Sequence, residues 1–97
     1  MAQIVYSPEA IEHAERAFAF PARHDLYAAN AALGAIREAV SVLANHPLLG
    51  RRLDDETREL VISFGETGYV ALYEFVPAMD EVWILALRHQ RELDYPA

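Results

Sequence analysis

Residues 58–89 read RELVISFGETGYVALYEFVPAMDEVWILALRH and are the most informative part of the chain for its fold. The first seven of these residues alternate with a period of two, which indicates a β-strand. Glycine stands at both ends of residues 65–68, and residues 77–80 read Pro-Ala-Met-Asp, so both segments are typical of turns. Two turns this short predict an antiparallel meander, with residues 69–76 and 82–89 as its second and third strands.

The second and third predicted strands are apolar on both faces. In residues 69–76 the odd positions are Tyr, Ala, Tyr and Phe, while the even positions include two Val and a Leu. In the third strand, strict alternation places Val82, Ile84 and Ala86 on one face and Trp83, Leu85 and Leu87 on the other. One helical hairpin covers only one face, so the other predicts a partner chain or a homodimer contact. In the alternative, the link at residues 47–56 and the tail from Arg91 fold over it.

The first half of the chain predicts a short strand followed by two helices. Residues 3–6 are β-prone, and Ser7 then caps a helix that has proline at its first position and ends at Phe20-Pro21. Asp25 caps a second helix that stops at Asn45-His46-Pro47. Its apolar residues recur at spacings of three and four, at Leu26, Ala29, Leu33, Ile36, Val40 and Leu43. Because the connection is short, the two helices are expected to form an antiparallel αα-hairpin.

These patterns predict a single domain over residues 1–97 of the α+β class. We expect an N-terminal strand and an antiparallel αα-hairpin packed on a three- to four-stranded antiparallel sheet. The absence of cysteine excludes a disulfide framework. The N-terminus lacks the basic and apolar regions of a signal peptide, and no apolar run approaches the ~20 residues of a membrane span, so a cytoplasmic location is predicted.

The chain is acidic, with a net charge of −7, and all eight of its cations are arginine. An acidic protein repels polyanions on average, so strong direct binding to free nucleic acid is not expected. His13, His24 and His46 do not have the spacing of metal ligands, and no glycine-rich phosphate loop is present. Neither a metal nor a cofactor is therefore predicted.

Short motifs follow one another along the second half of the chain. They are Pro47-x-x-Gly50-Arg51, Arg58-Glu59-Leu60, Gly68-Tyr69 with Tyr73, and Arg88-His89 close to Arg91 and Tyr95. In this order and spacing the segment resembles the RelE/ParE toxins of bacterial type II toxin–antitoxin systems, and the ParE-like members more than the RelE-like ones. The resemblance covers about half of the chain in specific residues. It implies an antiparallel sheet with a helical hairpin against it.

The resemblance also implies a function and a partner. Such a toxin serves plasmid stabilisation and is neutralised by a cognate antitoxin, whose disordered C-terminal segment folds onto the toxin and would cover the second apolar face. ParE-like members inhibit DNA gyrase by protein binding, whereas RelE-like members cut messenger RNA in the ribosome. The acidic, lysine-free chain departs from the dense basic surface of the nucleases. A ParE-like gyrase inhibitor is therefore the first interpretation, a ribosome-dependent endoribonuclease is the alternative, and a family member without toxicity is the third.

The nuclease interpretation requires catalytic residues, and the sequence offers candidates for them. Cleavage of RNA by its own 2′-OH needs a base, cations that face the phosphate and an acid for the leaving oxygen, and it needs no metal. Arg58 and Arg88 would face the phosphate. His89 or Glu59 would act as the base, with assistance from Tyr95.

Each of these candidates also has a structural interpretation. Arg58 would open a strand and pair with a carboxylate, at Glu92, Asp94 or Asp54. Arg88 would form an ion pair at the end of a strand, and His89 would close the edge of the sheet through a hydrogen bond.

Aromatic residues of the predicted strands are the candidates for binding a partner. Trp83, the single tryptophan, is either a core residue or the centre of a partner surface. The same two interpretations apply to Tyr69 and Tyr73, which share a face. Arg91 completes the predicted partner-binding set.

Overall fold

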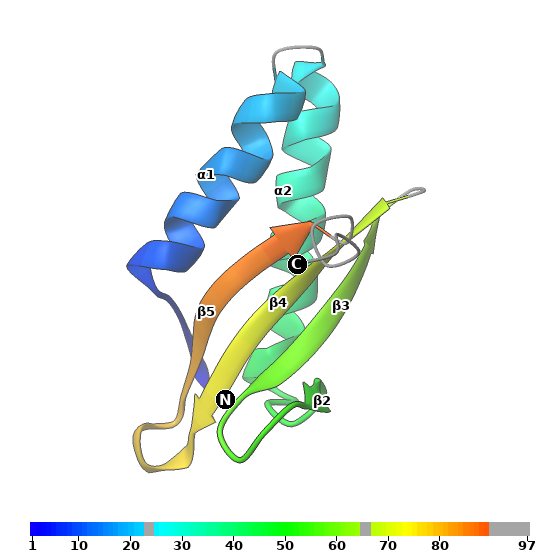
Figure 1. Cartoon of the computed structure of the whole chain (residues 1–97). Coiled ribbons are helices and arrows are strands. Elements are labelled where there is room, and N and C mark those ends of the chain that lie inside the picture. Colours follow the sequence, from blue (N-terminus) through cyan, green and yellow to red (C-terminus); the bar gives the residue numbers. More distant parts are fainter. Residues whose placement is uncertain (23–24, 65–66, 90–97) are drawn as a thin grey trace.

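The computed structural model describes residues 1–22, 25–64 and 67–89, and within them the chain forms two layers (Figure 1). The elements in chain order are β1 (Gln3–Tyr6), α1 (Pro8–Ala22), α2 (Leu26–Ser41), a 3-10 turn η1 (Val42–Ala44), β2 (Arg51–Arg52), β3 (Arg58–Phe64), β4 (Thr67–Val76), a 3-10 turn η2 (Pro77–Met79) and β5 (Glu81–His89). The strands form one sheet in the order β1-β5-β4-β3-β2. The hairpin of α1 and α2 lies against one face of this sheet.

The predicted α+β class is confirmed, with its N-terminal strand and helical hairpin, but the sheet is larger than predicted and is mixed. It has five strands, and β1 runs parallel to β5 while the other pairs are antiparallel. β1 is held at both ends, because Gln3 N–H donates to the Asp80 carbonyl (2.9 Å) and Ser7 N–H donates to the Ile84 carbonyl (2.9 Å). The fifth strand, β2, is a two-residue strand inside the link at residues 47–56, where no strand was predicted.

Both predicted helix caps are confirmed. Ser7 Oγ accepts a hydrogen bond from Ala10 N–H (3.0 Å), and Asp25 Oδ1 accepts one from Ala28 N–H (3.1 Å). Helix α1 continues to Ala22, past the end predicted at Phe20-Pro21, because a proline in the last turn removes only one backbone donor there. In the described part of the chain, no helix is long and apolar enough to cross a membrane.

The hairpin between β3 and β4 is tighter than predicted. Residues 65–68 were predicted to form its loop, but the pairing continues to Phe64 and Thr67, so Gly68 lies within β4 opposite Ser63. Residues 65–66 lie outside the described residues. Gly68 is buried within the strand, so at this end the glycine extends the pairing instead of forming the turn.

A β-bulge in β5 corrects the predicted division of faces. Leu72 pairs with Ala86 but Tyr73 pairs with Ile84, which leaves Leu85 as an extra residue. Beyond the bulge the alternation is therefore reversed. Leu87 joins Val82 and Ile84 in the core beneath the helices, whereas it was predicted to lie opposite them. Ala86 lies instead on the face that the helices do not cover.

The bulge is held in place by the start of α1. Ser7 Oγ donates a hydrogen bond to the Leu85 carbonyl (3.1 Å), and His13 Nδ1 accepts one from Leu87 N–H (3.2 Å). Backbone groups that lack a partner in the strand ladder at a bulge need partners elsewhere. His13 and Ser7 supply these partners, so His13 has a structural role that its isolated position in the sequence did not reveal.

The core lies between the sheet and the hairpin. Its most completely buried side chains are Leu43, Val40, Tyr73, Val82 and Ile84. The predicted apolar stripe of α2 is confirmed at Ala29, Ile36 and Val40, but Leu26 is 58% exposed. The tip of the hairpin extends beyond the sheet (Figure 1), so the first turn of α2 has no strand to cover it.

Tyr73 joins the core to the segment that precedes β2. Its ring is fully buried, and its hydroxyl donates to the Pro47 carbonyl (2.8 Å) and accepts from Gly50 N–H (2.8 Å). A Cβ atom at position 50 would lie 2.6 Å from both the Glu59 carbonyl oxygen and Tyr73 Cε1, so only glycine fits there. The hydroxyl therefore fixes residues 47–50 against the sheet.

Tyr73→Phe is expected to lower the free energy of unfolding by about 1–3 kcal/mol, because Gly50 N–H is left buried without its acceptor. Urea denaturation measures this difference. The matched control is Tyr27→Phe, since Tyr27 is 83% exposed on α2 and should leave the midpoint unchanged. Equal midpoints for the two variants would show that the Tyr73 hydroxyl does not hold the segment.

The same hydroxyl predicts a loss of stability in alkali. Burial raises the pKa of Tyr73 above its ordinary value. The stability that depends on the neutral hydroxyl is therefore fully present below a pH of about 10 and is lost as the pH rises through the raised pKa. Denaturation midpoints followed into alkali should fall more steeply for the wild type than for Tyr73→Phe, and parallel curves would contradict this cause.

Candidate functional site

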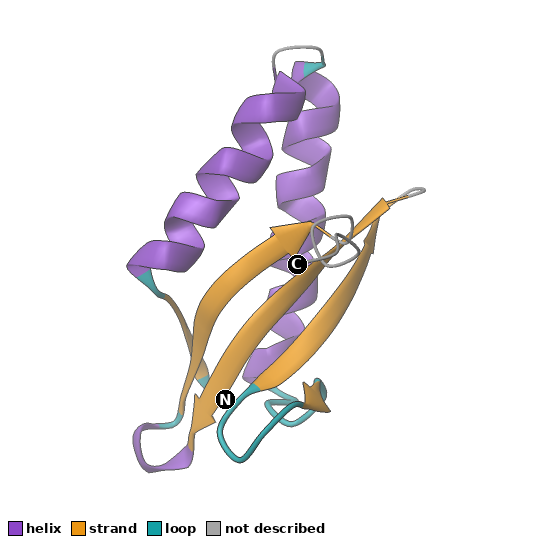
Figure 2. Cartoon of the chain, in the orientation of Figure 1, coloured by secondary structure: helices purple, strands orange, loops and turns teal. Residues whose placement is uncertain are grey.

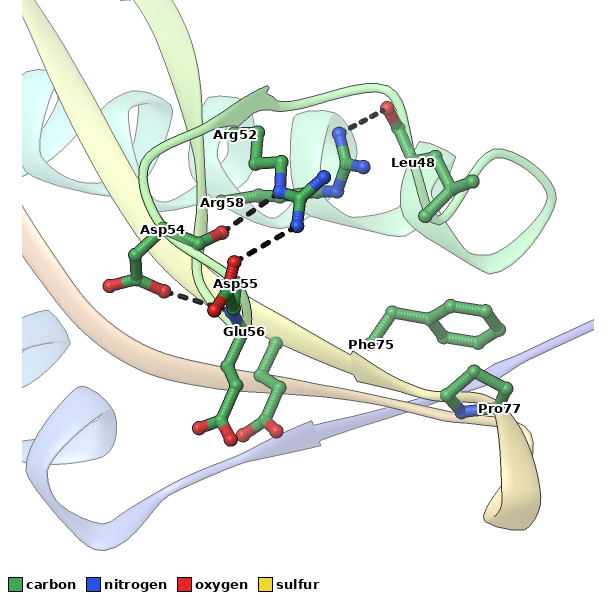
Figure 3. A pocket seen from close by; sticks show the side chains of 9 residues that line it. Leu48, Arg52, Asp54, Asp55, Glu56, Arg58, Phe75 and Pro77 are labelled. Carbon is green, nitrogen blue, oxygen red and sulfur yellow. Dashed lines mark hydrogen bonds and ion pairs between the residues drawn. The ribbon is translucent and has the colours of Figure 1, made fainter.

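A cavity of about 340 Å³ opens where β3 begins, between the 47–57 segment and the end of β4 (Figure 3). Its walls are formed by Leu48, Arg52, Asp54, Asp55, Glu56, Arg58, Glu74, Phe75 and Pro77. Figure 3 shows Arg52 and Arg58 on one side of this space and Phe75 and Pro77 on the other. The cavity combines two cations, four carboxylates and a small apolar wall, so it is a polar site with more negative than positive charge.

Arg58 is a structural cation of this cavity. One guanidinium nitrogen, Nη1, donates to the carbonyls of Leu48 (3.2 Å) and Gly50 (2.9 Å). The prediction that Arg58 opens a strand is confirmed, but its partners are backbone carbonyls and not the predicted Asp54 carboxylate. Glu92 and Asp94, the other predicted partners, lie outside the described residues. Together with Tyr73, Arg58 thus satisfies most of the polar backbone of residues 47–50.

The acidic turn beside Arg58 is held by its own backbone. Asp54 Oδ1 accepts from the N–H groups of Glu56 (2.9 Å) and Thr57 (2.8 Å), and these two bonds hold the Asp54 pKa below its ordinary value. Arg52 donates to the Asp54 carbonyl (3.1 Å) and to Asp55 Oδ1 (3.3 Å). Arg52 thus pairs within the turn, whereas Arg51 pairs with Glu59 on β3.

The nuclease candidates do not form one group. Arg88 and His89 are consecutive in β5, so their side chains point to opposite faces of the sheet. Arg58 pairs with Tyr73 while Arg88 pairs with Val70, three residues away on β4. This separation is about 10 Å along the strand, with two strand spacings of ~4.8 Å across it. Tyr95 lies outside the described residues.

His89 lies on the helix side of the sheet, against an aromatic ring. Its imidazole meets the ring of Tyr69 edge to face, with the ring centres 5.2 Å apart and an angle of 85° between the planes. Both residues also take part in further polar or ring contacts. Tyr69 and His89 form the last pairing of the β4–β5 ladder.

The predicted partner-binding residues are divided between the core and the surface. Tyr73 is fully buried and Tyr69 is 7% exposed, so both belong to the core side of the sheet. Trp83 is half-buried on the opposite face, and its indole N–H donates to Glu81 Oε1 (3.1 Å). Arg91 lies outside the described residues. Of the described candidates, Trp83 alone is on a face available to a partner.

Glu74, which lines the cavity from the end of β4, was not among the predicted site residues. Gly50 was named only as part of a motif, and the structure shows that it is buried against Tyr73. The Pro-x-x-Gly spacing indicates a special role for Gly50, and the alternation of β4 places Glu74 on one face. Neither pattern identifies the residues that lie beside them in the sheet. Among the described residues, no cluster of three or more His, Asp or Glu is arranged to hold a metal ion.

Comparison with known proteins places this fold in a family. The chain matches the model of the ParE toxin of the type II toxin–antitoxin system parDE over residues 4–94. Toxin RelE3 of Caulobacter vibrioides is 43% identical over 65 residues, which are 67% of this chain and 68% of that protein. These two matches define the superfamily as RelE/ParE, as the motifs indicated. The chain belongs to the ParE toxin family and is the toxin of a type II toxin–antitoxin system.

Solved structures show the same fold at low sequence identity. The chain is similar to the chromosomal ParDE system from P. aeruginosa, with a TM-score of 0.75 and 17% identity over 92% of this chain and 96% of that one. It is also similar to the crystal structure of a metal-bound toxin from Helicobacter pylori, with a TM-score of 0.51 and 14% identity over 96% of this chain and 99% of that one. At these identities the likeness extends to the fold alone.

Arg58→Ala is expected to lower the free energy of unfolding by about 1–3 kcal/mol, because two backbone carbonyls lose a charged donor. Arg88→Ala is the matched control, since Arg88 is exposed at the other end of the sheet and its removal should change stability by less than about 0.5 kcal/mol. Chemical denaturation compares the two. A loss of stability in Arg88→Ala as large as that in Arg58→Ala would contradict the structural role of Arg58.

Proposed function

We propose that this toxin acts by protein binding, as a ParE-like inhibitor of DNA gyrase that its cognate antitoxin neutralises. The observation that supports this proposal is the dispersal of the nuclease candidates. The Arg58 guanidinium is bonded to two backbone carbonyls, and Arg88 and His89 are on opposite faces. A phosphate in the act of cleavage needs its cations and its base within hydrogen-bond reach at one point. The described candidates do not provide such a point.

The electrostatics of the chain support the same proposal. The net charge is −7, and four carboxylates surround the two arginines of the cavity. Ribosomal RNA and messenger RNA are polyanions, and binding to them draws its affinity from cations that displace counterions. A surface with this charge repels such a target. A protein target carries no such requirement, so the charge is compatible with gyrase and unfavourable for the ribosome.

A RelE-like ribosome-dependent endoribonuclease is the second candidate function. It is favoured by one observation, the 43% identity with a protein named Toxin RelE3. In that case Arg88, which is exposed at the end of β5, is the described cation best placed to meet a phosphate. The chain is an enzyme only in this second candidate.

Expression of the chain without its antitoxin distinguishes the two functions. We expect growth arrest with loss of negative supercoiling in a reporter plasmid and with intact transcripts. Purified toxin should inhibit supercoiling by gyrase, and added antitoxin should restore it. Topoisomer gels and transcript mapping provide the two measurements.

Two outcomes would contradict the proposal in different ways. Codon-phased cuts in transcripts that disappear in Arg88→Ala or His89→Ala would establish the nuclease instead. Arg37→Ala, on an exposed position of α2, is the control that should keep such cuts. Growth without any arrest, from a folded and abundant chain, would indicate a family member that has lost its toxicity.

A further inference from the structure

The face of the sheet opposite the helices carries an exposed apolar strip. Pairing of β3, β4 and β5 places Leu72 beside Glu59 and Trp83 beside Glu74, all on this face. Val61, on β3, is 54% exposed, and Leu72 and Trp83 are half-buried. Both helices of the described chain lie against the other face of the sheet (Figure 2). We call the surface formed by Val61, Leu72, Trp83, Glu59, Glu74 and Glu81 the open face.

Only part of this side of the sheet is available to a partner. Val70 and Ala86 lie on the same side, opposite Val61 and Leu72 in the strand pairing, and are buried. The accessible apolar groups of the open face are therefore interspersed with buried ones. Its carboxylates lie towards the ends at which β3 begins and β4 terminates.

Three carboxylates border the strip, one from each of three adjacent strands. Glu59 pairs with Arg51, and Glu81 accepts a hydrogen bond from the indole of Trp83, which is neutral. In the described part of the chain no cation pairs with Glu74 or Glu81. Glu74 also shares the walls of the cavity with Asp55 and Glu56. The open face is thus an apolar strip bordered by two carboxylates that no described cation pairs with, Glu74 and Glu81, while Arg88 lies on the same side at the other end of the sheet.

We propose that the open face binds a segment of the antitoxin that carries apolar side chains together with lysine or arginine. Apolar residues of that segment cover Leu72, Trp83 and Val61, and its cations meet Glu74 and Glu81. Complementary charge at the border of an apolar contact favours the matching partner and speeds its association. This inference rests on the antitoxin of the proposed function and specifies the chemistry of its binding segment.

Charge also excludes two other occupants of the open face. A second copy of this chain has the same net charge of −7 and would bring carboxylates against carboxylates in a symmetric contact. Residues 90–97 read QRELDYPA, with two acidic residues and one arginine, so this segment does not compensate the border. An antitoxin segment with net positive charge satisfies both the apolar strip and its border.

Trp83 provides the readout for a binding experiment, because it is the only tryptophan and lies within the open face. The probe is a peptide of about 12 residues with alternating Leu and Lys, which at ~3.3 Å per residue spans the five strands at ~4.8 Å spacing. The matched probe replaces every Lys by Glu. We expect the Leu-Lys peptide to change Trp83 fluorescence on binding, with an affinity that falls as salt rises from about 50 to about 500 mM. The Leu-Glu peptide should not bind.

Variants of Glu74 locate the contact. Glu74→Gln should raise the Kd for the Leu-Lys peptide about two- to fivefold, and Glu74→Lys should raise it further. Glu38→Gln and Glu38→Lys, on an exposed position of α2, carry the same charge changes and should have no effect. The same four variants are then measured with the antitoxin encoded beside the toxin gene, whose affinity should follow the same order. Equal binding of both peptides, or an antitoxin affinity unchanged in Glu74→Lys, would overturn the inference.

These measurements use purified proteins and no gyrase, so their outcome is separate from that of the proposed function. If gyrase is not inhibited but Glu74→Lys weakens the antitoxin, the inference holds and the proposed target is wrong. If gyrase is inhibited but the affinity for the antitoxin is unchanged in Glu74→Lys, the proposed target is right and the inference is wrong.

Discussion

The two hydrogen bonds of the Tyr73 hydroxyl hold in place the segment that precedes β2 and, through it, the edge of the sheet. The hydroxyl connects the middle of the sheet to residues 47–50, and the close approach requires glycine at position 50. Arg58 then binds two carbonyls of the same segment, so β2 can form beside β3. The motif residues Pro47, Gly50 and Arg58 are thus explained by packing and backbone hydrogen bonding. Their recurrence in a family of toxins does not by itself make them catalytic.

Local signals in the sequence predicted the elements well and their long-range relations less well. The caps at Ser7 and Asp25 depend on neighbouring residues, and the structure confirms both. The bulge at Leu85 depends on groups that Ser7 and His13 supply from over 70 residues away, so alternation alone misassigned Leu87. The parallel pairing of β1 with β5 has no local signal either. Errors of face and register follow from contacts that the sequence pattern does not contain.

In the candidate site, too, the sequence predicted residue types better than it predicted their neighbours in space. The sequence identified the arginines and His89 as chemically capable residues and named structural alternatives for each. In the structure the Arg58 guanidinium donates to backbone carbonyls, and the His89 ring contacts the ring of Tyr69. Trp83 remains the described candidate on a partner-accessible face, and the acidic border beside it was visible in the sequence only as net charge. Only the register of the strands shows that these carboxylates lie on one surface.

The pairing of β1 with β5 has a consequence for how the toxin acquires its shape during synthesis. Residues 3–6 pair with residues 81–84, so the first strand has no partner in the sheet until nearly all of the described chain exists. Contacts so distant in sequence form late, because loop-closure entropy opposes them until the intervening structure is in place. The helical hairpin, whose contacts are local, can form first. The sheet is therefore completed only when β5 is available to pair with β1.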